Sequence, residues 1–266
     1  MAQNAPQQPG ALEAVKTFLA STPPITRALF LCTLLLPVVM RISPPVYLYT
    51  TLTRLSDGLL APLQPWRLFT HFFIQGISLN LLFQLIFLYR YSMAAEASVF
   101  SNNTPSYAYF VLLLSLGCDV LAYAAGMPSL PGALVMGIVY VWAQVNSADE
   151  VSFMFGLRFP ALYLPWAMIA FEMIQMQGGI PIHSFIGILV GHTYFFFERV
   201  LPAQDGNGTG TRWTQTPAWF RGLFPNETWS PPGSEMTGEK NQAQGGSSSG
   251  ASRWAGSGRR LGTEND

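Results

Sequence analysis

Six apolar stretches, separated by short segments with prolines, glycines or charges, dominate the first 200 residues of the chain. They cover residues 25–40, 77–95, 106–125, 131–145, 160–176 and 181–197. An α-helix rises about 1.5 Å per residue, so about 20 apolar residues cross the roughly 30 Å hydrocarbon core of a bilayer. The pattern therefore predicts an all-α polytopic membrane protein with six transmembrane helices. Several stretches are shorter than this, and we expect the bilayer to thin around them.

Two segments near the N-terminus are apolar without forming a continuous span. In residues 1–24, apolar side chains recur at the spacing of one helical face, at Leu12, Val15, Phe18 and Leu19. This spacing predicts a short amphipathic helix on the membrane surface, with a frayed end as the alternative. Residues 44–75 are interrupted by four prolines and three charges, more breaks than a spanning helix tolerates. We expect them to form a loop embedded at one membrane interface.

The chain changes character after residue 200. Residues 201–266 are rich in Gly, Ser, Thr, Asn, Gln and Pro, a composition that buries too little apolar surface to offset the entropy of ordering a chain. We therefore predict a disordered tail. An apolar patch at residues 219–224 is the exception, and we expect it to touch the membrane surface. One membrane domain, residues 25–200, precedes the tail.

Composition supports a membrane location. Half of the residues are hydrophobic and only 11% are charged, against roughly 25% charged in soluble domains. The net charge is zero, so nothing indicates nucleic acid as a partner. Cys32 and Cys118 lie inside apolar stretches and form no CxxC pair, which predicts neither a disulfide nor a metal site.

The distribution of basic residues indicates an orientation. If there are six spans, one side of the membrane carries Lys16, Arg27, Arg90, Arg158 and Arg199, and the other carries Arg41, Arg54 and Arg67. This excess favours both termini in the cytosol. The segment of residues 1–24 is then cytosolic or interfacial, and the tail is cytosolic.

Ionisable residues inside the apolar stretches are the candidates for chemistry. Asp119 and Glu172 are costly at membrane depth, and two readings stay open: a functional role, or a hydrogen bond within the helix bundle. His183 and His192 are nine residues apart, half a turn around a helix, so they cannot share a metal ion. We take Asp119, Glu172, His183 and His192 as candidate polar residues of a substrate groove, without a cofactor.

Two short motifs point to helix packing and loop structure. Gly187 and Gly191 form a GxxxG pair in the sixth stretch, which lets a second helix approach closely. Trp66-Arg67 stands just before the second stretch and resembles the WR motif in the first loop of the rhomboid superfamily. An interfacial Trp beside a snorkelling Arg would give the same dipeptide.

Longer runs resemble one rhomboid-like family, the Derlins. They are Pro24–Arg27, Tyr140–Asn146, Val151–Phe159, Tyr163–Trp166 and Gly187–Phe196. The resemblance covers roughly residues 20–200 and implies a six-helix rhomboid-like bundle with an embedded first loop and no protease activity. Active rhomboids carry a catalytic histidine three residues before the glycine pair of the sixth span, where this chain has Ser184, and a GxSG serine motif, which this chain lacks.

The end of the tail resembles a second known motif. Residues 254–262, WAGSGRRLG, are similar to the SHP box, which binds a hexameric AAA+ ATPase, the valosin-containing protein, or its cofactors. The resemblance assigns ATPase binding to Trp254, Gly256, Gly258, Arg259, Arg260, Leu261 and Gly262. The usual first aromatic of this box is Phe, and here it is Trp. The alternative is a terminus that is rich in Gly and Arg and resembles the box by chance.

Together these resemblances imply a multi-pass protein of the endoplasmic-reticulum membrane with both termini in the cytosol. Its role would lie in ER-associated degradation, in which misfolded proteins move from the lumen or the bilayer to the cytosol. The implied partners are the ATPase, a membrane ubiquitin-ligase complex, misfolded substrates and lipid, and homo- or hetero-oligomers stay open. Two other functions stay open as well: a small-solute transporter or channel, and a passive membrane tether for the ATPase.

Overall fold

The structure is a computed structural model that describes residues 10–43, 66–204, 215–224 and 228–230. The chain divides into two units, residues 1–231 and 232–266, and the described residues all lie in the first. The predicted ATPase-binding box at 254–262 and most of the predicted embedded loop lie outside the described residues.

The described part of the chain is mostly helical, and each predicted apolar stretch contains one helix. These helices are α2 (Pro24–Ile42), α5 (Leu79–Ala94), α6 (Thr104–Ala124), α7 (Ala133–Val145), α8 (Leu164–Gln175) and α9 (Ile182–Phe195). By length and composition, α2 and α6 qualify as membrane spans, and α7 is a shorter apolar helix. The prediction of six spans therefore stays a prediction.

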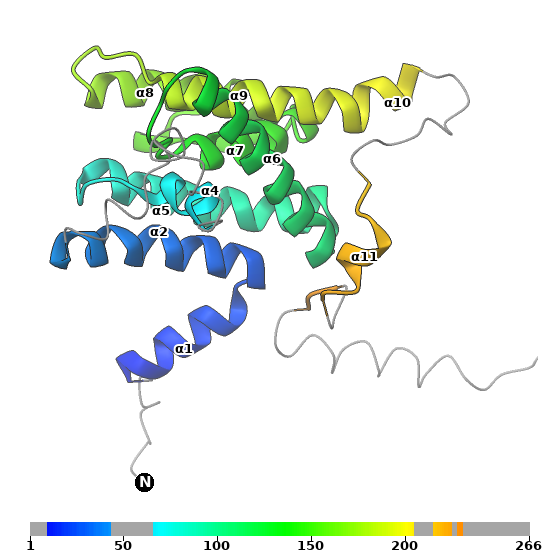
Figure 1. Cartoon of the computed structure of the whole chain (residues 1–266), viewed down its shortest axis with the longest axis horizontal. Coiled ribbons are helices and arrows are strands. Elements are labelled where there is room, and N and C mark those ends of the chain that lie inside the picture. Colours follow the sequence, from blue (N-terminus) through cyan, green and yellow to red (C-terminus); the bar gives the residue numbers. More distant parts are fainter. Residues whose placement is uncertain (1–9, 44–65, 205–214, 225–227, 231–266) are drawn as a thin grey trace, which may run out of the picture. The chain divides into compact units, whose positions relative to one another are not determined.

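Shorter elements flank these helices. They are α1 (Ala11–Ser21), α4 (Arg67–Thr70), the 3-10 turn η3 (His71–Phe73), the π-helical turns η4 (Ala95–Val99) and η7 (Phe196–Val200), α10 (Leu201–Gln204) and α11 (Ala218–Arg221). In Figure 1, α9 runs through η7 into α10 without a break toward the right of the view. From Ile182 to Gln204 this continuous helix is about 34 Å long.

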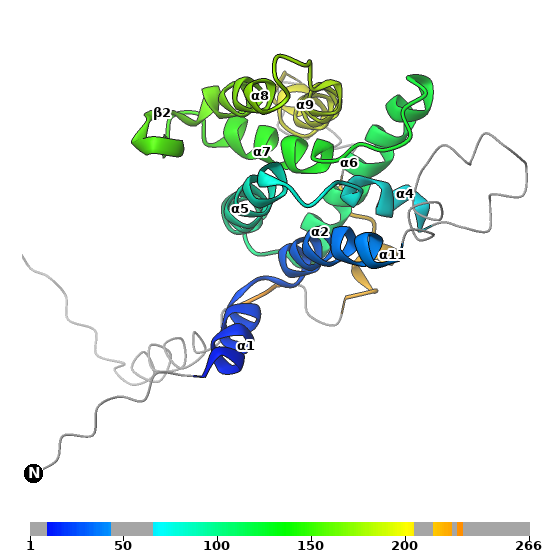
Figure 2. The same ribbon diagram turned by 90° about the vertical axis from the view of Figure 1, so that its left-hand side faces the viewer.

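Helix α7 forms the centre of the bundle. All of its residues from Ala133 to Ala143 are buried, and Figure 2 shows it between α5 on one side and α8 and α9 on the other. Its start differs from the prediction, which began the fourth stretch at residue 131. Gly132 has a left-handed φ of 82°, a conformation that favours glycine, so the helix begins only at Ala133.

The six helices alternate in direction between two ends of the bundle. Thr26 at the start of α2 contacts Ser92 at the end of α5, which contacts Tyr107 at the start of α6. We call this end the tail end, because α9 leaves from it toward the tail. The opposite end, where α2 and α8 finish and α5 and α9 begin, is the loop end.

A small β-hairpin at the tail end departs from the all-α prediction. Strands β1 (Glu150–Ser152) and β2 (Arg158–Pro160) pair antiparallel with Val151 opposite Phe159, around the 3-10 turn η5 (Met154–Gly156). Phe153 stacks on Phe87 of α5 at 5.5 Å. The hairpin is followed by the 3-10 turn η6 (Ala161–Tyr163) and then by α8.

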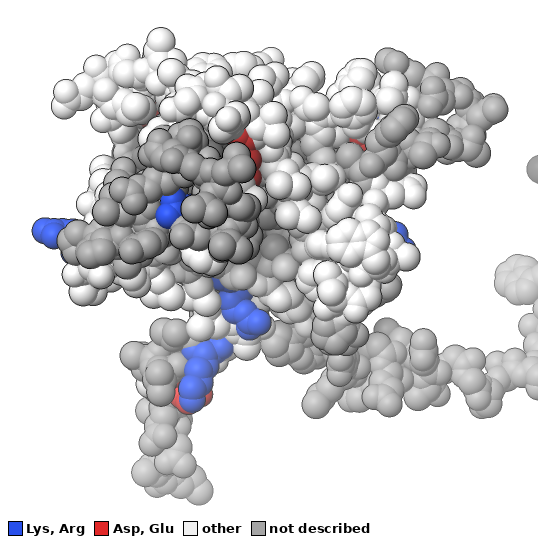
Figure 3. Space-filling view, viewed as in Figure 1, with Lys and Arg blue, Asp and Glu red and all other residues white. Residues whose placement is uncertain are grey.

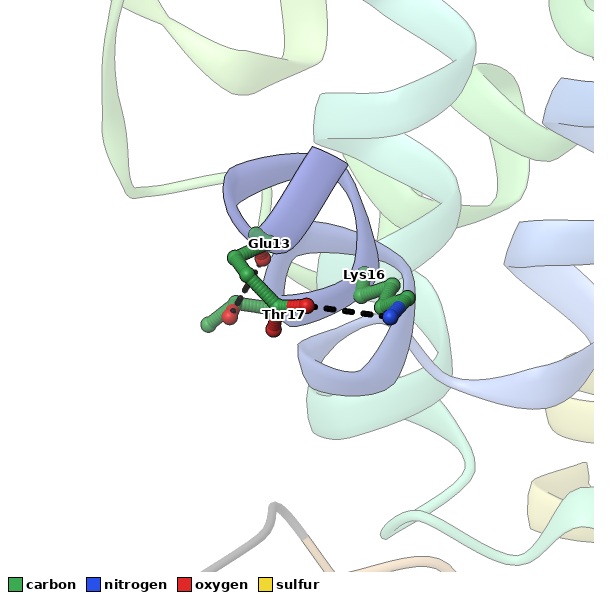
Figure 4. A network of polar contacts seen from close by, with 3 residues as sticks. All are labelled: Glu13, Lys16 and Thr17. Atoms are coloured by element: carbon green, nitrogen blue, oxygen red, sulfur yellow. Dashed lines mark hydrogen bonds and ion pairs between the residues drawn. The ribbon is translucent and has the colours of Figure 1, made fainter. Parts of the chain in front are cut away.

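Helix α1 is present where the N-terminal spacing predicts a helix. Its exposed side carries an ion pair of Lys16 with Glu13 at 3.0 Å, and Thr17 Oγ1 donates to the Glu13 carbonyl (Figure 4). Phe18 stacks on Tyr89 of α5 at 5.1 Å. The helix is therefore held against the bundle by an aromatic contact at the tail end.

The beginning of the predicted disordered tail is partly ordered. Helix α11 lies within it, and Phe220 contacts Tyr109 of α6 with ring centroids 5.3 Å apart. Further on, Trp229 N donates to the Asn102 carbonyl at 2.9 Å. The prediction of disorder was thus too broad at these positions, because aromatic and backbone contacts with a distant helix supply the order that local composition does not.

The surface of the bundle is poor in charge. In Figure 3 the described atoms are mainly white, with isolated blue and red side chains. Many large apolar side chains are exposed on the outer faces of the helices, among them Leu35, Leu82, Val120, Trp166 and Leu189. Such a surface suits contact with lipid tails.

Candidate functional site

Three polar side chains meet at the loop end between α8 and α9. The Oε1 atom of Glu172 lies 2.6 Å from Nε2 of His183, and Ser184 Oγ donates to Glu172 Oε2 at 2.5 Å. The turn between the helices is tight, because Gln177 and Gly178 adopt left-handed φ angles of 54° and 91°. The turn therefore brings the end of α8 and the start of α9 together. We call Glu172, His183 and Ser184 the Glu172 site.

A small cavity lies beside the Glu172 site. It has a volume of about 40 Å³, enough for about one water molecule. Its polar lining consists of Asn80, Gln84, Glu172, Gln175 and Ser184, and its apolar lining comes from the inner sides of α5, α7 and α8. The cavity therefore offers a carboxylate, a hydroxyl and three amide groups within an otherwise apolar bundle.

An aromatic contact joins α5 to α8 beside this cavity. Phe83 and Phe171 meet edge to face with ring centroids 4.9 Å apart, and both line the cavity. Phe171 also contacts Phe153 of the hairpin at 6.2 Å. The two rings therefore form part of the apolar wall of the cavity.

The order of the three groups differs from that of a serine protease. In a Ser-His-acid relay the histidine lies between the acid and the serine and takes the serine's proton. Here the carboxylate of Glu172 lies between His183 and Ser184. This order satisfies a partly buried carboxylate with two hydrogen bonds, and it does not place His183 to activate Ser184.

The four predicted groove residues are divided among three places. Glu172 and His183 meet, as described. Asp119 of α6 lies instead beside His71 of η3, with 3.3 Å between Oδ1 and Nε2, and both side chains are buried. His192 forms a hydrogen bond between its Nδ1 atom and the Tyr140 hydroxyl of α7 at 2.7 Å. The structure therefore does not bring Asp119 and His192 to the Glu172 site, and a common substrate groove for all four residues stays a prediction.

The two residues of the WR motif have opposite environments. Trp66 is 50% exposed, whereas Arg67 at the start of α4 is 4% exposed. The carbonyl of Arg67 lies 3.0 Å from Nδ1 of His71. Arg67 therefore does not snorkel to the surface, and it lies next to the buried pair of His71 and Asp119.

The glycine pair of α9 faces the backbone of α7 at very short range. A Cβ atom on Gly187 would lie 2.2 Å from the Ala133 carbonyl oxygen. On Gly191 it would lie 3.0 Å from the Gly137 carbonyl oxygen. This contact sets the distance between α7, which lines the cavity with Val135 and Met136, and α9, which carries the Glu172 site.

Sequence reasoning missed a second polar cluster, at the tail end. Thr26 Oγ1 donates to Glu96 Oε2 at 2.9 Å and lies 2.8 Å from Ser92 Oγ, and Ser92 Oγ lies 2.5 Å from the Tyr107 hydroxyl. All four side chains are buried. The cluster joins α2, α5, η4 and α6. One signal was available, because Glu96 directly follows an apolar stretch.

Glu96 gives this cluster a pH dependence. Burial raises the pKa of Glu96 from 4.5 to about 7, against the opposing effect of the Thr26 hydrogen bond. The folded chain therefore holds the proton more tightly than the unfolded chain. The resulting stability is fully present below about pH 4.5 and is lost as the pH rises through about 7.

We expect the substitution Glu96→Gln to remove this dependence, because the amide still accepts from Thr26 and cannot ionise. Relative to the variant, the native chain should lose thermal stability between about pH 5 and about pH 8. Thermal unfolding in detergent at both pH values measures the difference. Substitution of the exposed Glu150 by Gln serves as the control. If the native chain and Glu96→Gln differ in thermal stability by the same amount at both pH values, Glu96 is not the source of the pH dependence.

Within the described residues, no three His, Cys, Asp or Glu side chains lie close enough together to hold a metal ion. Among the described residues, polar groups inside the bundle instead form a partly buried cluster around Glu172 and two buried groups, around His71 and around Glu96. Of these three groups of described residues, only the Glu172 site borders the cavity between α5, α7, α8 and α9.

Comparisons with known proteins agree with the resemblance found in the sequence. A model of the Der1-like family matches residues 22–218. Derlin-1 of Mus musculus is 35% identical over 212 residues, which cover 77% of this chain and 81% of that protein. Derlin-1 of Homo sapiens is 34% identical with the same coverage, and Derlin-1 of Caenorhabditis elegans is 31% identical over 218 residues, 80% and 85% of the two chains. The chain therefore belongs to the Der1-like family, the Derlins of ER-associated degradation.

Proposed function

We propose that this chain is a non-proteolytic component of ER-associated degradation that helps misfolded proteins leave the lumen or the bilayer for the cytosol. The observation that carries the proposal is the Glu172 site with its cavity. It places a carboxylate and several amides inside an apolar bundle, where a polar segment of a substrate would otherwise find no partner.

The lengths of the helices around the site support the first step, a local thinning of the bilayer. Helix α8 has 12 residues and is about 18 Å long. The hydrocarbon core is about 30 Å thick. A bilayer that adapts to so short a helix becomes thinner, which lowers the barrier for a polar chain segment.

The seam between α5 and α8 is the proposed entry to the site. The two helices meet there through Phe83 and Phe171, a pair of rings that can separate without breaking a hydrogen bond. A substrate segment that parts the rings reaches Asn80, Gln84 and Gln175, whose amide groups can hydrogen-bond its backbone. The Glu172 site lies at the end of this path.

The tail completes the proposal. With six spans, both termini lie in the cytosol, and the box at residues 254–262 recruits the AAA+ ATPase that supplies the pulling force. A membrane ubiquitin-ligase complex would mark the emerging substrate. The membrane domain then binds the substrate, while the tail binds the ATPase.

Substitution of Glu172 tests the substrate role. We expect Glu172→Leu to lengthen the half-life of a misfolded membrane substrate that carries a polar residue in its span. The reason is that leucine has no carboxylate with which that residue could form a hydrogen bond. Glu172→Gln, which keeps a hydrogen-bonding group, should have a smaller effect. Pulse-chase measurement of the substrate checks this, with the exposed Glu150→Leu as the control.

If Glu172→Leu leaves the half-life unchanged while the variant remains folded, the Glu172 site does not receive substrate. If ATPase binding is lost together with turnover, the division between membrane domain and tail fails. Thermal unfolding of the purified variant separates either result from misfolding.

A second candidate function, a transporter or channel for a small solute or ion, is favoured by the buried pair of Asp119 and His71. Apart from their contact with each other at 3.3 Å, the carboxylate oxygens of Asp119 and Nε2 of His71 make no hydrogen bond with the described residues, which leaves them able to bind a passing ion. Solute flux into vesicles that contain the purified chain decides between the two functions. Flux that disappears in Asp119→Asn would favour the transporter.

A further inference from the structure

A larger cavity lies at the tail end, away from the Glu172 site. Its volume is about 440 Å³. It lies between the first turns of α6, the last turns of α7 and the end of α9 with η7. None of the residues that line it borders the Glu172 site, so it is a separate feature of the bundle. We call it the tail-end cavity.

The packing of α6 against α9 bounds this space on the side of the bundle's middle. The two helices touch where a Cβ atom on Gly117 would lie 2.5 Å from Cγ1 of Val190. Nearer the tail end, Phe110 of α6 and Tyr194 of α9 are still in contact, with ring centroids 4.6 Å apart. Tyr194 also lines the cavity, and Val141 and Val145 of α7 form its floor.

The walls of the cavity divide into an apolar and a polar half. Apolar side chains come from the floor and the sides, Val99, Phe100, Val141, Val145 and Phe195. Polar groups are contributed by Ser101, Asn103, Ser106, Tyr194, Glu198, Arg199 and Thr228. The one carboxylate among them, Glu198, already has an interaction of its own. Arg199 forms no ion pair within the described part of the chain, so its charge is available to a ligand. This combination suits an amphiphile with an anionic group.

The first part of the tail closes one side of the cavity. Thr228 lines it, and its neighbour Trp229 is held by the hydrogen bond from its N–H to the Asn102 carbonyl. Thr216 Oγ1, in an earlier part of the tail, also donates to Ser106 Oγ of α6 at 3.3 Å. The left-handed φ of 57° at Asn102 is held by its N–H donating to the Glu96 carbonyl. The described residues of the tail therefore form part of one wall of the cavity.

The depth of the cavity indicates which amphiphile it takes. Tyr194 and Arg199 line it at the end of the bundle from which the tail leaves, and Tyr and Arg are typical of the membrane–water interface. Phospholipids are the amphiphiles present there in excess. Their phosphate carries the negative charge that a guanidinium binds well.

We propose that the tail-end cavity is a binding site for a membrane phospholipid. Arg199 contacts the phosphate, Ser106 and Asn103 hydrogen-bond the glycerol region, and the start of an acyl chain lies on Val141 and Val145. This inference rests on the membrane location of the bundle and on the position of the tail end at an interface. It does not depend on the substrate role of the Glu172 site.

Native mass spectrometry of the full chain, released from nanodiscs of phosphatidylcholine and phosphatidylinositol, tests the proposal. The native chain should retain one phospholipid that survives stepwise removal of the others. Val145→Phe, which fills the floor of the cavity, should lose it, whereas Val145→Ala should keep it. Ser106→Leu fills the same space from α6 and tests the site if Val145→Phe does not fold.

The role of Arg199 has its own control. Arg199→Gln should release the retained lipid about tenfold faster, because a hydrogen bond to a charged group is lost, and Arg221→Gln on the exposed α11 should not. Retention of the same lipid in both folded cavity-filling variants would overturn the site. Retention unchanged in Arg199→Gln would overturn the phosphate contact. Turnover of a misfolded substrate need not change in any of these variants.

Discussion

Replacing Gly187 by alanine is expected to destabilise the bundle by about 3 kcal/mol, at the upper end of the cost of overpacking. The added Cβ would lie 2.2 Å from the carbonyl oxygen of Ala133, far inside the contact distance. The neighbouring atom belongs to the backbone of α7, so it cannot swing aside as a flexible side chain does. Helices α7 and α9 must move apart, and the Glu172 site must move with α9.

Two other glycines supply the controls. Gly191→Ala meets the Gly137 carbonyl at 3.0 Å and should cost about 1 kcal/mol. Gly76→Ala meets nothing within 4 Å and should have almost no effect. Unfolding of the purified chain in mixed micelles measures all three, together with the half-life of a misfolded substrate. A Gly187→Ala variant as stable as Gly76→Ala would contradict the packing described for α7 and α9.

Loss of the tail box is expected to lower co-purification of the AAA+ ATPase by more than tenfold. A combined substitution of Trp254 and Leu261 by alanine removes the two side chains that the resemblance to the SHP box indicates as its apolar anchors. Truncating a buried anchor in an interface costs about 2 kcal/mol or more, and about 1.4 kcal/mol corresponds to a tenfold change in affinity. The membrane domain should remain as stable as in the native chain.

The matched control for this variant is Trp219→Ala, which removes a Trp that is exposed on α11 in the same tail. It should leave ATPase binding unchanged. Equal binding by the native chain and the box variant would show that the resemblance to the SHP box has no function here. If substrate turnover requires the box but is the same in Glu172→Leu as in the native chain, the chain is a passive tether for the ATPase.

The helices of the bundle could be predicted from the sequence because each is a continuous apolar run with a clear boundary. Pro24 begins α2, the Asn103 side chain caps α6 by accepting from Ser106 N, and Pro165 lies in the first turn of α8. The hairpin could not be predicted in this way. Its strands have three residues each, too few to show an alternating pattern.

The partners of the ionisable residues could not be predicted, because tertiary packing decides them. His183 and Glu172 are 11 residues apart and meet across a turn, but Asp119 finds His71 on an element that carries almost no sequence pattern. Tertiary packing also explains why part of the tail is structured. Phe220 is held by Tyr109 of α6, a contact between residues more than a hundred positions apart that composition does not reveal.

In the proposed function, a substrate segment enters the bundle between α5 and α8 and reaches the Glu172 site. Photo-crosslinking from Gln175, which lines the cavity, detects such a segment when a misfolded membrane substrate is trapped by an inactive ATPase. The control position is Val120, which is exposed on the outer face of α6. We expect a substrate adduct at Gln175 and none above background at Val120. Adducts of equal yield at both positions, or at Val120 alone, would show that substrate does not enter the bundle between α5 and α8.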